Sequence, residues 1–165
     1  MKGFRFAGAL ALLLAAAGGV SAQNAGQGAA APADQSFTVR GDDPEMNAAK
    51  RRAIAELPDF YRHMTNPAQG ERDFQVKFDI APGDERTIYV WAGELDRSRS
   101  PMVGTLMNQP NTGHRMGDRV TIREEDIIDW SYYRGPVLIG SHTERVLLGR
   151  MPPEAAARMR EAYGW

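Results

Sequence analysis

Few residues of this chain have types and spacings that could support catalysis. The three histidines are His63, His114 and His142, and no two of them lie at the close helical or turn spacing with which ligands converge on a metal ion. Ser141 precedes His142, but adjacent residues on a strand point to opposite faces, and a hydroxyl needs a neighbouring base to become a nucleophile. No glycine-flanked nucleophile elbow is present either. The pattern predicts no catalytic residue.

The densest acidic cluster consists of Glu124, Glu125, Asp126 and Asp129. Carboxylates bind hard cations such as calcium, but this cluster lacks the alternating ligand positions and the turn glycine of a calcium loop. We interpret it as negative charge at the start of a short helical turn, where it complements the helix dipole. We therefore predict no metal and no cofactor.

The aromatic residues Tyr89, Trp91, Trp130 and Tyr132 are better candidates for binding than for chemistry. Tyrosine and tryptophan are common at binding hot spots, yet large aromatic residues of small domains also fill the core. Strand alternation places Tyr89 and Trp91 on one face together. We expect Trp130 to be a core residue, and Trp91 is equally compatible with core and surface.

The N-terminus has the three parts of an export signal: Lys2 and Arg5, the small and apolar run 6–20, and small residues before Gln23. The run is shorter than the roughly 20 residues that span a membrane. We predict a signal peptide at 1–22, cleaved after Ala22, and a mature protein that is periplasmic or secreted and not held in a membrane.

Composition narrows the possible classes of protein further. The chain has no cysteine, so the fold relies on its core and not on disulfides. Without residues 1–22 it has 18 basic and 21 acidic residues, a net charge of −3. Nucleic-acid binders usually gather a basic excess on one face, so we predict no nucleic-acid partner.

The mature part divides into a flexible leader at 23–36, which lacks large apolar residues, and a single α+β domain at 37–150, followed by a tail at 151–165. Residues 37–39 could form a short first strand. Asp43 and Pro44 begin a helix with an apolar stripe, which we expect in two pieces with a kink or break at Leu57–Pro58, ending before Asn66.

The period then changes from helical to alternating. Strands are predicted at 74–80, 87–91, 102–107, 119–123, 130–133 and 137–139, a helical turn at 124–126, and a tail helix at 153–163. Residues 143–148 are ambiguous between strand and helix. The predicted fold is α+β: the N-terminal helix packs on a curled, mostly antiparallel sheet of five to six strands, which could close into a small barrel, and a C-terminal helix follows.

The order of several short motifs resembles the bacterial family called domain of unknown function 2314, the YegJ-like proteins. The motifs are Met46-Asn47-Ala48-Ala49, Leu57-Pro58-Asp59-Phe60, Phe74-Gln75-Val76-Lys77, Ile88-Tyr89-Val90-Trp91, Gly104-Thr105-Leu106 with Asn108 and Pro110, Gly117-Asp118-Arg119-Val120, Ile128-Asp129-Trp130 with Tyr132, and Gly140 with Thr143 and Arg145. The resemblance covers about 42–148 and leaves the tail from Pro152 to Trp165 unplaced. It implies a stand-alone bacterial domain, often exported, with no assigned activity, and a distant similarity to immunity-type domains of toxin systems.

Within these motifs, eight residues are expected to be structural. They are Asn47, Gly104, Asn108, Gly117, Asp118, Asp129, Gly140 and Arg145. Gly117-Asp118 is expected to form a turn and not a phosphate cradle, which needs several glycines followed by lysine and a helix.

Two functions from different classes remain open. The first is a non-enzymatic envelope domain that binds a protein, peptide or glycan through Tyr89, Trp91 and the loop 96–101. The second is a hydrolase of cell-envelope material with Asp129 or Glu124 as base and His142 or His114 nearby. An immunity-like protein and a structural accessory without a small-molecule site are further alternatives.

Overall fold

The structure is a computed structural model, and it describes residues 43–83, 87–110 and 112–165. The predicted signal peptide, the leader and the short strand at 37–39 lie outside the described residues.

The first helix, α1, spans Pro44–Thr65 and begins as predicted: the Asp43 carboxylate accepts a hydrogen bond of 3.0 Å from the Met46 N–H. The predicted division into two pieces at Leu57–Pro58 is wrong, because the helix runs through Pro58 as a single element. Proline removes one backbone donor, but the apolar stripe continues across it, and packing of that stripe on the sheet holds the helix together.

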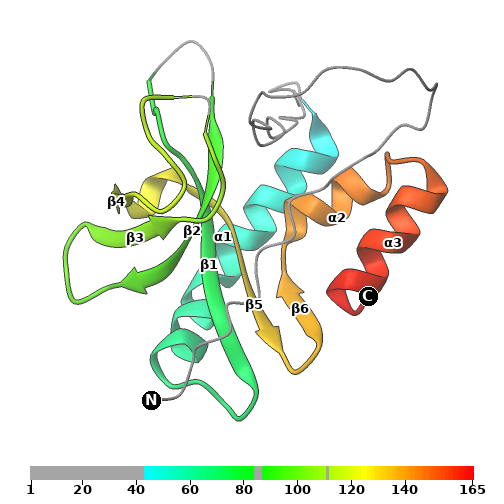
Figure 1. Cartoon of the computed structure of the whole chain (residues 1–165), viewed down its shortest axis with the longest axis horizontal. Coiled ribbons are helices and arrows are strands. Elements are labelled where there is room, and N and C mark those ends of the chain that lie inside the picture. The colour runs from blue at the N-terminus through cyan, green and yellow to red at the C-terminus, as the bar shows by residue number, and fades with distance from the viewer. Residues whose placement is uncertain (1–42, 84–86, 111) are drawn as a thin grey trace, which may run out of the picture.

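Six strands form one antiparallel sheet in the order β4-β3-β2-β1-β5-β6. They are β1 (Glu71–Asp79), β2 (Tyr89–Asp96), β3 (Met102–Leu106), β4 (Arg119–Ile122), β5 (Ile127–Arg134) and β6 (Val137–Gly140). The predicted curling into a barrel is wrong: the sheet is open, and β4 and β6 lie at opposite edges (Figure 1). A barrel requires the two edge strands to pair with a consistent tilt and stagger, and here α2 and α3 lie at the β6 edge instead (Figure 1).

The remaining elements are helical. A 3₁₀ turn, η1, at Glu124–Asp126 confirms the predicted helical turn, and α3 at Pro153–Tyr163 confirms the tail helix. The ambiguous segment is a helix, α2, at His142–Leu148. The domain therefore has two C-terminal helices where the sequence predicted one.

The core lies between α1 and one face of the sheet. Trp130 is 5% exposed, its ring centroid lies 5.3 Å from that of Phe60, and its Nε1 donates a hydrogen bond of 2.9 Å to the Ala53 carbonyl of α1. Tyr132 is 2% exposed and stacks on Phe74 with ring centroids 5.0 Å apart. The expectation that Trp130 belongs to the core is confirmed.

Side chains from α2 and the tail cover the β6 edge. Trp165 Nε1 donates a hydrogen bond of 2.6 Å to the Leu138 carbonyl, and Arg145 Nε donates one of 3.1 Å to the Gly140 carbonyl. The Arg145 guanidinium lies 3.7 Å from the centre of the Trp165 ring. The tail thus belongs to the domain, because Trp165 occupies a carbonyl of an edge strand that would otherwise be open to pairing with another chain.

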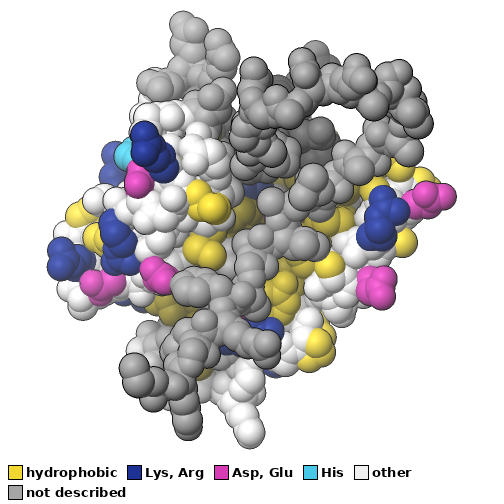
Figure 2. All heavy atoms as spheres, viewed as in Figure 1, with side chains coloured by type: hydrophobic (Ala, Val, Ile, Leu, Met, Phe, Trp, Pro, Cys, Tyr) yellow, Lys and Arg dark blue, Asp and Glu magenta, His cyan; other side chains and the backbone are white. Residues whose placement is uncertain are grey.

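Among the described residues, none of the helices combines the length and the apolar character that crossing a membrane requires. On the described part of the face in Figure 2, charged side chains of both signs lie toward β3 and β4 on one side and over α3 on the other, with apolar side chains between them.

Candidate functional site

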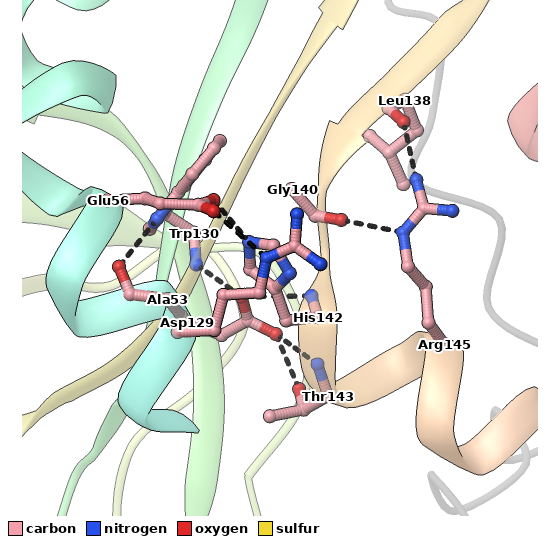
Figure 3. Close-up of polar contacts among 10 residues, drawn as sticks. Ala53, Glu56, Asp129, Trp130, Leu138, Gly140, His142, Thr143 and Arg145 are labelled. Carbon is pink, nitrogen blue, oxygen red and sulfur yellow. Dashed lines mark hydrogen bonds and ion pairs between the residues drawn. The ribbon is translucent and has the colours of Figure 1, made fainter. Parts of the chain in front are cut away.

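Asp129 is a buried side chain whose carboxylate accepts four hydrogen bonds. Its Oδ1 accepts hydrogen bonds from the backbone N–H groups of Trp130 at 2.9 Å and His142 at 3.1 Å, and its Oδ2 accepts from the backbone N–H of Thr143 at 2.7 Å and from its hydroxyl at 2.6 Å (Figure 3). Ser141, which stands at the N-cap position of α2, makes no side-chain cap bond. Asp129 therefore caps α2 from a neighbouring strand.

Burial shifts the protonation equilibrium of the Asp129 carboxyl group. Desolvation, and secondly the charge of Glu144, raise the pKa of Asp129 to about 6, while the hydrogen bonds from Thr143 and Trp130 act in the opposite direction. A proton on Oδ2 can be shared with the Thr143 hydroxyl, which also lies 3.0 Å from Glu144 Oε2.

Gly140 makes the turn from β6 into α2 possible. Its φ is +78°, and a Cβ atom there would lie 2.3 Å from the Trp130 carbonyl oxygen. Only glycine fits this position, because both the backbone conformation and the space exclude a side chain.

The imidazole of His142 faces α1 and not the Asp129 carboxylate. Its Nε2 lies 2.9 Å from Glu56 Oε2, and its ring meets Trp130 edge-on at 5.6 Å between centroids (Figure 3). Burial lowers the pKa of His142, and the nearby Glu56 carboxylate opposes that effect. The structure thus brings Asp129 and His142 together, but through the His142 backbone.

Lys77 of β1 extends this network onto the second face of the sheet, opposite the face that packs on α1. Its Nζ lies 2.7 Å from Glu144 Oε1 and 3.3 Å from the Thr143 hydroxyl, and both charged side chains are less than one fifth exposed. The Trp91 ring centre is 5.7 Å from the same Nζ. The ion pair ties α2 to the middle of the sheet.

Tyr89 and Trp91 lie on this second face, half-buried, as the alternation of β2 predicts. Lys50 donates a hydrogen bond of 2.8 Å to the Tyr89 hydroxyl, and the Trp91 N–H donates one of 2.7 Å to Asn108 Oδ1. Trp130 and Tyr132 are in the core on the α1 side, so the four aromatic residues do not form one surface.

A groove of about 510 Å³ lies between α1, the β2–β3 loop and η1. Its lining residues are Tyr61, Arg97, Arg99, Ser100, Pro101, Met102, Ile122, Arg123, Glu124 and Glu125. The predicted binding loop 96–101 forms one wall. The groove and Tyr89 are at opposite ends of β2, roughly 23 Å apart along the strand, so the predicted surface divides into two regions.

The centre of the groove is a stacked pair. The Arg97 guanidinium lies 3.5 Å from the centre of the Tyr61 ring, and its Nη2 is 3.9 Å from Glu124 Oε2. Burial, and secondly Glu124, raise the pKa of Tyr61 to about 12. Arg123, in contrast, is bound at 2.6 and 2.8 Å by both carboxylate oxygens of Asp126.

The other motif residues have structural positions. Gly104 packs in β3 against Ile122 and Ala92, and Gly117 and Asp118 form the turn into β4, where Asp118 Oδ2 accepts from the Arg115 N–H at 2.8 Å. Asn47 lies in the second turn of α1, and its N–H donates to the Asp43 carbonyl at 2.9 Å.

Neither of the other two histidines joins a cluster of ligands. His114 lies in the β3–β4 loop, 3.9 Å from Asp118, and His63 contacts Glu71 at 3.0 Å. Across residues 43–83, 87–110 and 112–165, no group of three or more histidine, cysteine, aspartate or glutamate side chains could hold a metal ion.

Sequence reasoning missed Glu56, Lys77, Tyr61 and Arg97. The β1–β5 register places Lys77 opposite Asp129, and a pairing over such a sequence separation has no local signal. A clue for Arg97 was its position beside Arg99 in a loop already singled out.

Comparisons with known proteins support the resemblance. The family model of DUF2314, described as "Uncharacterized protein conserved in bacteria", matches residues 43–165, so it includes the tail that the motifs left unplaced. The chain is 31% identical over 121 residues to "Uncharacterized protein YegJ" of Escherichia coli (strain K12), which covers 72% of this chain and 77% of that protein. No solved structure matches the chain.

Proposed function

The chain belongs to the bacterial DUF2314 family, and from that premise we propose that it is a non-enzymatic binding module of the cell envelope. The observation that carries the proposal is the groove beside Tyr61, whose rim is formed by a loop with two exposed arginines, Arg97 and Arg99. Concave sites with an apolar floor and a few placed polar groups are the usual form of binding pockets.

The hydrogen bonds already made by the candidate catalytic residues, Asp129 and His142, favour binding over catalysis. Both oxygens of Asp129 accept two hydrogen bonds each, and the His142 imidazole is paired with Glu56. A general base needs a lone pair within reach of a substrate proton. These groups are used to hold α2 in place.

The envelope location rests on the signal-like segment 1–22. Intact-mass spectrometry of the protein recovered from its bacterium should give a chain that begins at Gln23. A chain that retains residues 1–22 in the cytoplasmic fraction would remove the envelope from the proposal.

Site-specific photo-crosslinking tests the binding function. A photo-reactive amino acid at Arg99, on the groove rim, should capture a discrete partner in living cells, whereas the same probe at the exposed Glu154 of α3 should not. Equal capture at both positions, or none at Arg99, would contradict a binding groove. A third probe at Trp91 examines the second face, where Tyr89 and Trp91 form the other half of the predicted surface.

A hydrolase remains the alternative, because the structure does bring Asp129 and His142 together. It predicts that the purified chain releases soluble fragments from cell-wall material and that Asp129→Asn abolishes the release. The immunity-like alternative predicts a toxin gene beside the gene of this chain.

A further inference from the structure

The groove has walls of opposite charge. Arg97 and Arg99 stand on the β2–β3 loop with side chains 41% and 71% exposed, and Glu124 and Glu125 stand on η1 with side chains 66% and 70% exposed. Between them, Ser100 and Pro101 are exposed, whereas Tyr61, Met102 and Ile122 are buried beneath the groove. A ligand in the groove therefore meets positive charge on one side and negative charge on the other.

These charges do not neutralise one another at close range. The Arg97 and Glu124 groups are 3.9 Å apart, and Arg99 Nε lies 3.4 Å from Asp96 Oδ2. Arg123 also lines the acidic wall, 3.7 Å from Glu125 Oε1, but its guanidinium is bound by both carboxylate oxygens of Asp126. Charge-assisted hydrogen bonds have lengths of about 2.7 to 2.9 Å. Asp96 is also engaged by the Ser98 hydroxyl at 2.6 Å, so both arginines retain donors for a carboxylate from outside.

The positive wall is also held in position. The Arg97 guanidinium stacks 3.5 Å from the centre of the Tyr61 ring, and Tyr61 is buried on α1. An arginine that is already ordered loses less side-chain entropy when a ligand binds. The stacking also leaves the edge of the guanidinium open to a planar carboxylate.

From this arrangement we infer that the groove binds a segment of a partner protein that carries an acidic and a basic side chain on either side of an apolar one. The carboxylate pairs with Arg97 and Arg99, the cation pairs with Glu124 and Glu125, and the apolar side chain contacts Pro101, the exposed apolar residue of the lining. A purely anionic or purely cationic segment meets repulsion from one wall. The inference rests on the proposed binding function and adds the chemistry of the partner.

Titration of the full ¹⁵N-labelled chain with defined peptides tests this inference. The probe is the blocked peptide acetyl-Lys-Ala-Leu-Ala-Glu-amide, and the comparisons replace Lys, Glu or both by Gln. We expect the dipolar probe to shift the amide signals of 97–102 and 122–125 and to bind roughly tenfold more tightly than the doubly neutral peptide, with an advantage that falls at high salt. Equal affinity of these two peptides, or shifts elsewhere, would overturn the inference.

Variants add a second test that does not depend on the probe alone. Arg97→Glu with Arg99→Glu should abolish the preference for the dipolar peptide and favour acetyl-Lys-Ala-Leu-Ala-Lys-amide, because both walls are then negative. The matched control is Arg51→Glu, an exposed residue about 15 Å along α1 from Tyr61, which should change nothing. Unaltered selectivity in the double variant would refute the inference.

The two proposals fail in different ways. Crosslinking at Arg99 to a partner whose capture is unaffected by Arg97→Glu would refute the mixed-charge segment and leave the binding function standing. Absence of any crosslink in cells, with charge-selective peptide binding intact, would refute the proposed function instead.

Discussion

Replacing Asp129 by alanine should be among the most destabilising single substitutions in this domain. Asp129 is fully buried, and its carboxylate satisfies the backbone N–H groups of Trp130, His142 and Thr143. Alanine leaves these three donors buried without an acceptor, whereas the Thr143 hydroxyl can turn to Glu144, 3.0 Å away. At about 1 to 1.5 kcal/mol for each lost bond, the expected loss is about 3 to 4 kcal/mol.

Urea denaturation at pH 7, followed by tryptophan fluorescence, measures this loss as a lower midpoint with an unchanged slope. The matched control is Asp118→Ala, which removes one bond to an exposed N–H at 2.8 Å and should cost about 0.5 to 1 kcal/mol. Asp129→Asn keeps one acceptor oxygen and should fall between the two. If Asp129→Ala cost no more than Asp118→Ala, the cap on α2 would not depend on this carboxylate.

Three further predictions concern the same region. Gly140→Ala should cost more than about 3 kcal/mol, because the new Cβ would lie 2.3 Å from the Trp130 carbonyl oxygen, while Gly135→Ala, at φ +60° with open space, should cost about 1 kcal/mol in the same denaturation assay. Deleting Trp165 should lower the unfolding midpoint and increase self-association in sedimentation experiments, because the β6 edge loses its cover. The pKa of Asp129 is raised to about 6, so its stabilising contribution is present at low pH and is lost as pH rises through that value; the wild type should lose about 2 kcal/mol of stability relative to Asp129→Asn between pH 4 and 7, and a difference that grows with pH would contradict the shift.

Local patterns predicted the elements that depend on local physics. The Asp43 cap, the alternation of β1 and the β5–β6 hairpin are each determined within a few residues, and each is present. The continuous α1 was not predictable from Pro58 alone, because the missing hydrogen bond is a local cost and the packing that outweighs it comes from the sheet.

The shape of the sheet and the composition of the site depend on contacts between distant parts of the chain. The β1–β5 pairing joins Glu71 to Arg134, and it brings the chain before β2 beside the chain after η1. Strand alternation does not specify which strands are neighbours, so neither the open sheet nor the Asp129–Lys77 pairing could be derived from it. The same lack of information about distant neighbours limited the prediction of the groove. The sequence identified its loop but not Tyr61, which lies on α1 far away in the sequence.

The residues that carry the family resemblance and the residues of the groove are different sets. Asp129, Gly140 and Arg145 meet at the joint between β5, β6 and α2, where they satisfy backbone groups and fit a tight turn. Tyr61 and Arg97 lie outside the motifs. A fold that is specified by such a joint can accept changes in an exposed groove at little cost in stability. We therefore expect members of the family to share the joint and to differ in the groove, each with its own partner; groove positions as constant as Asp129 in a set of family sequences would contradict this expectation.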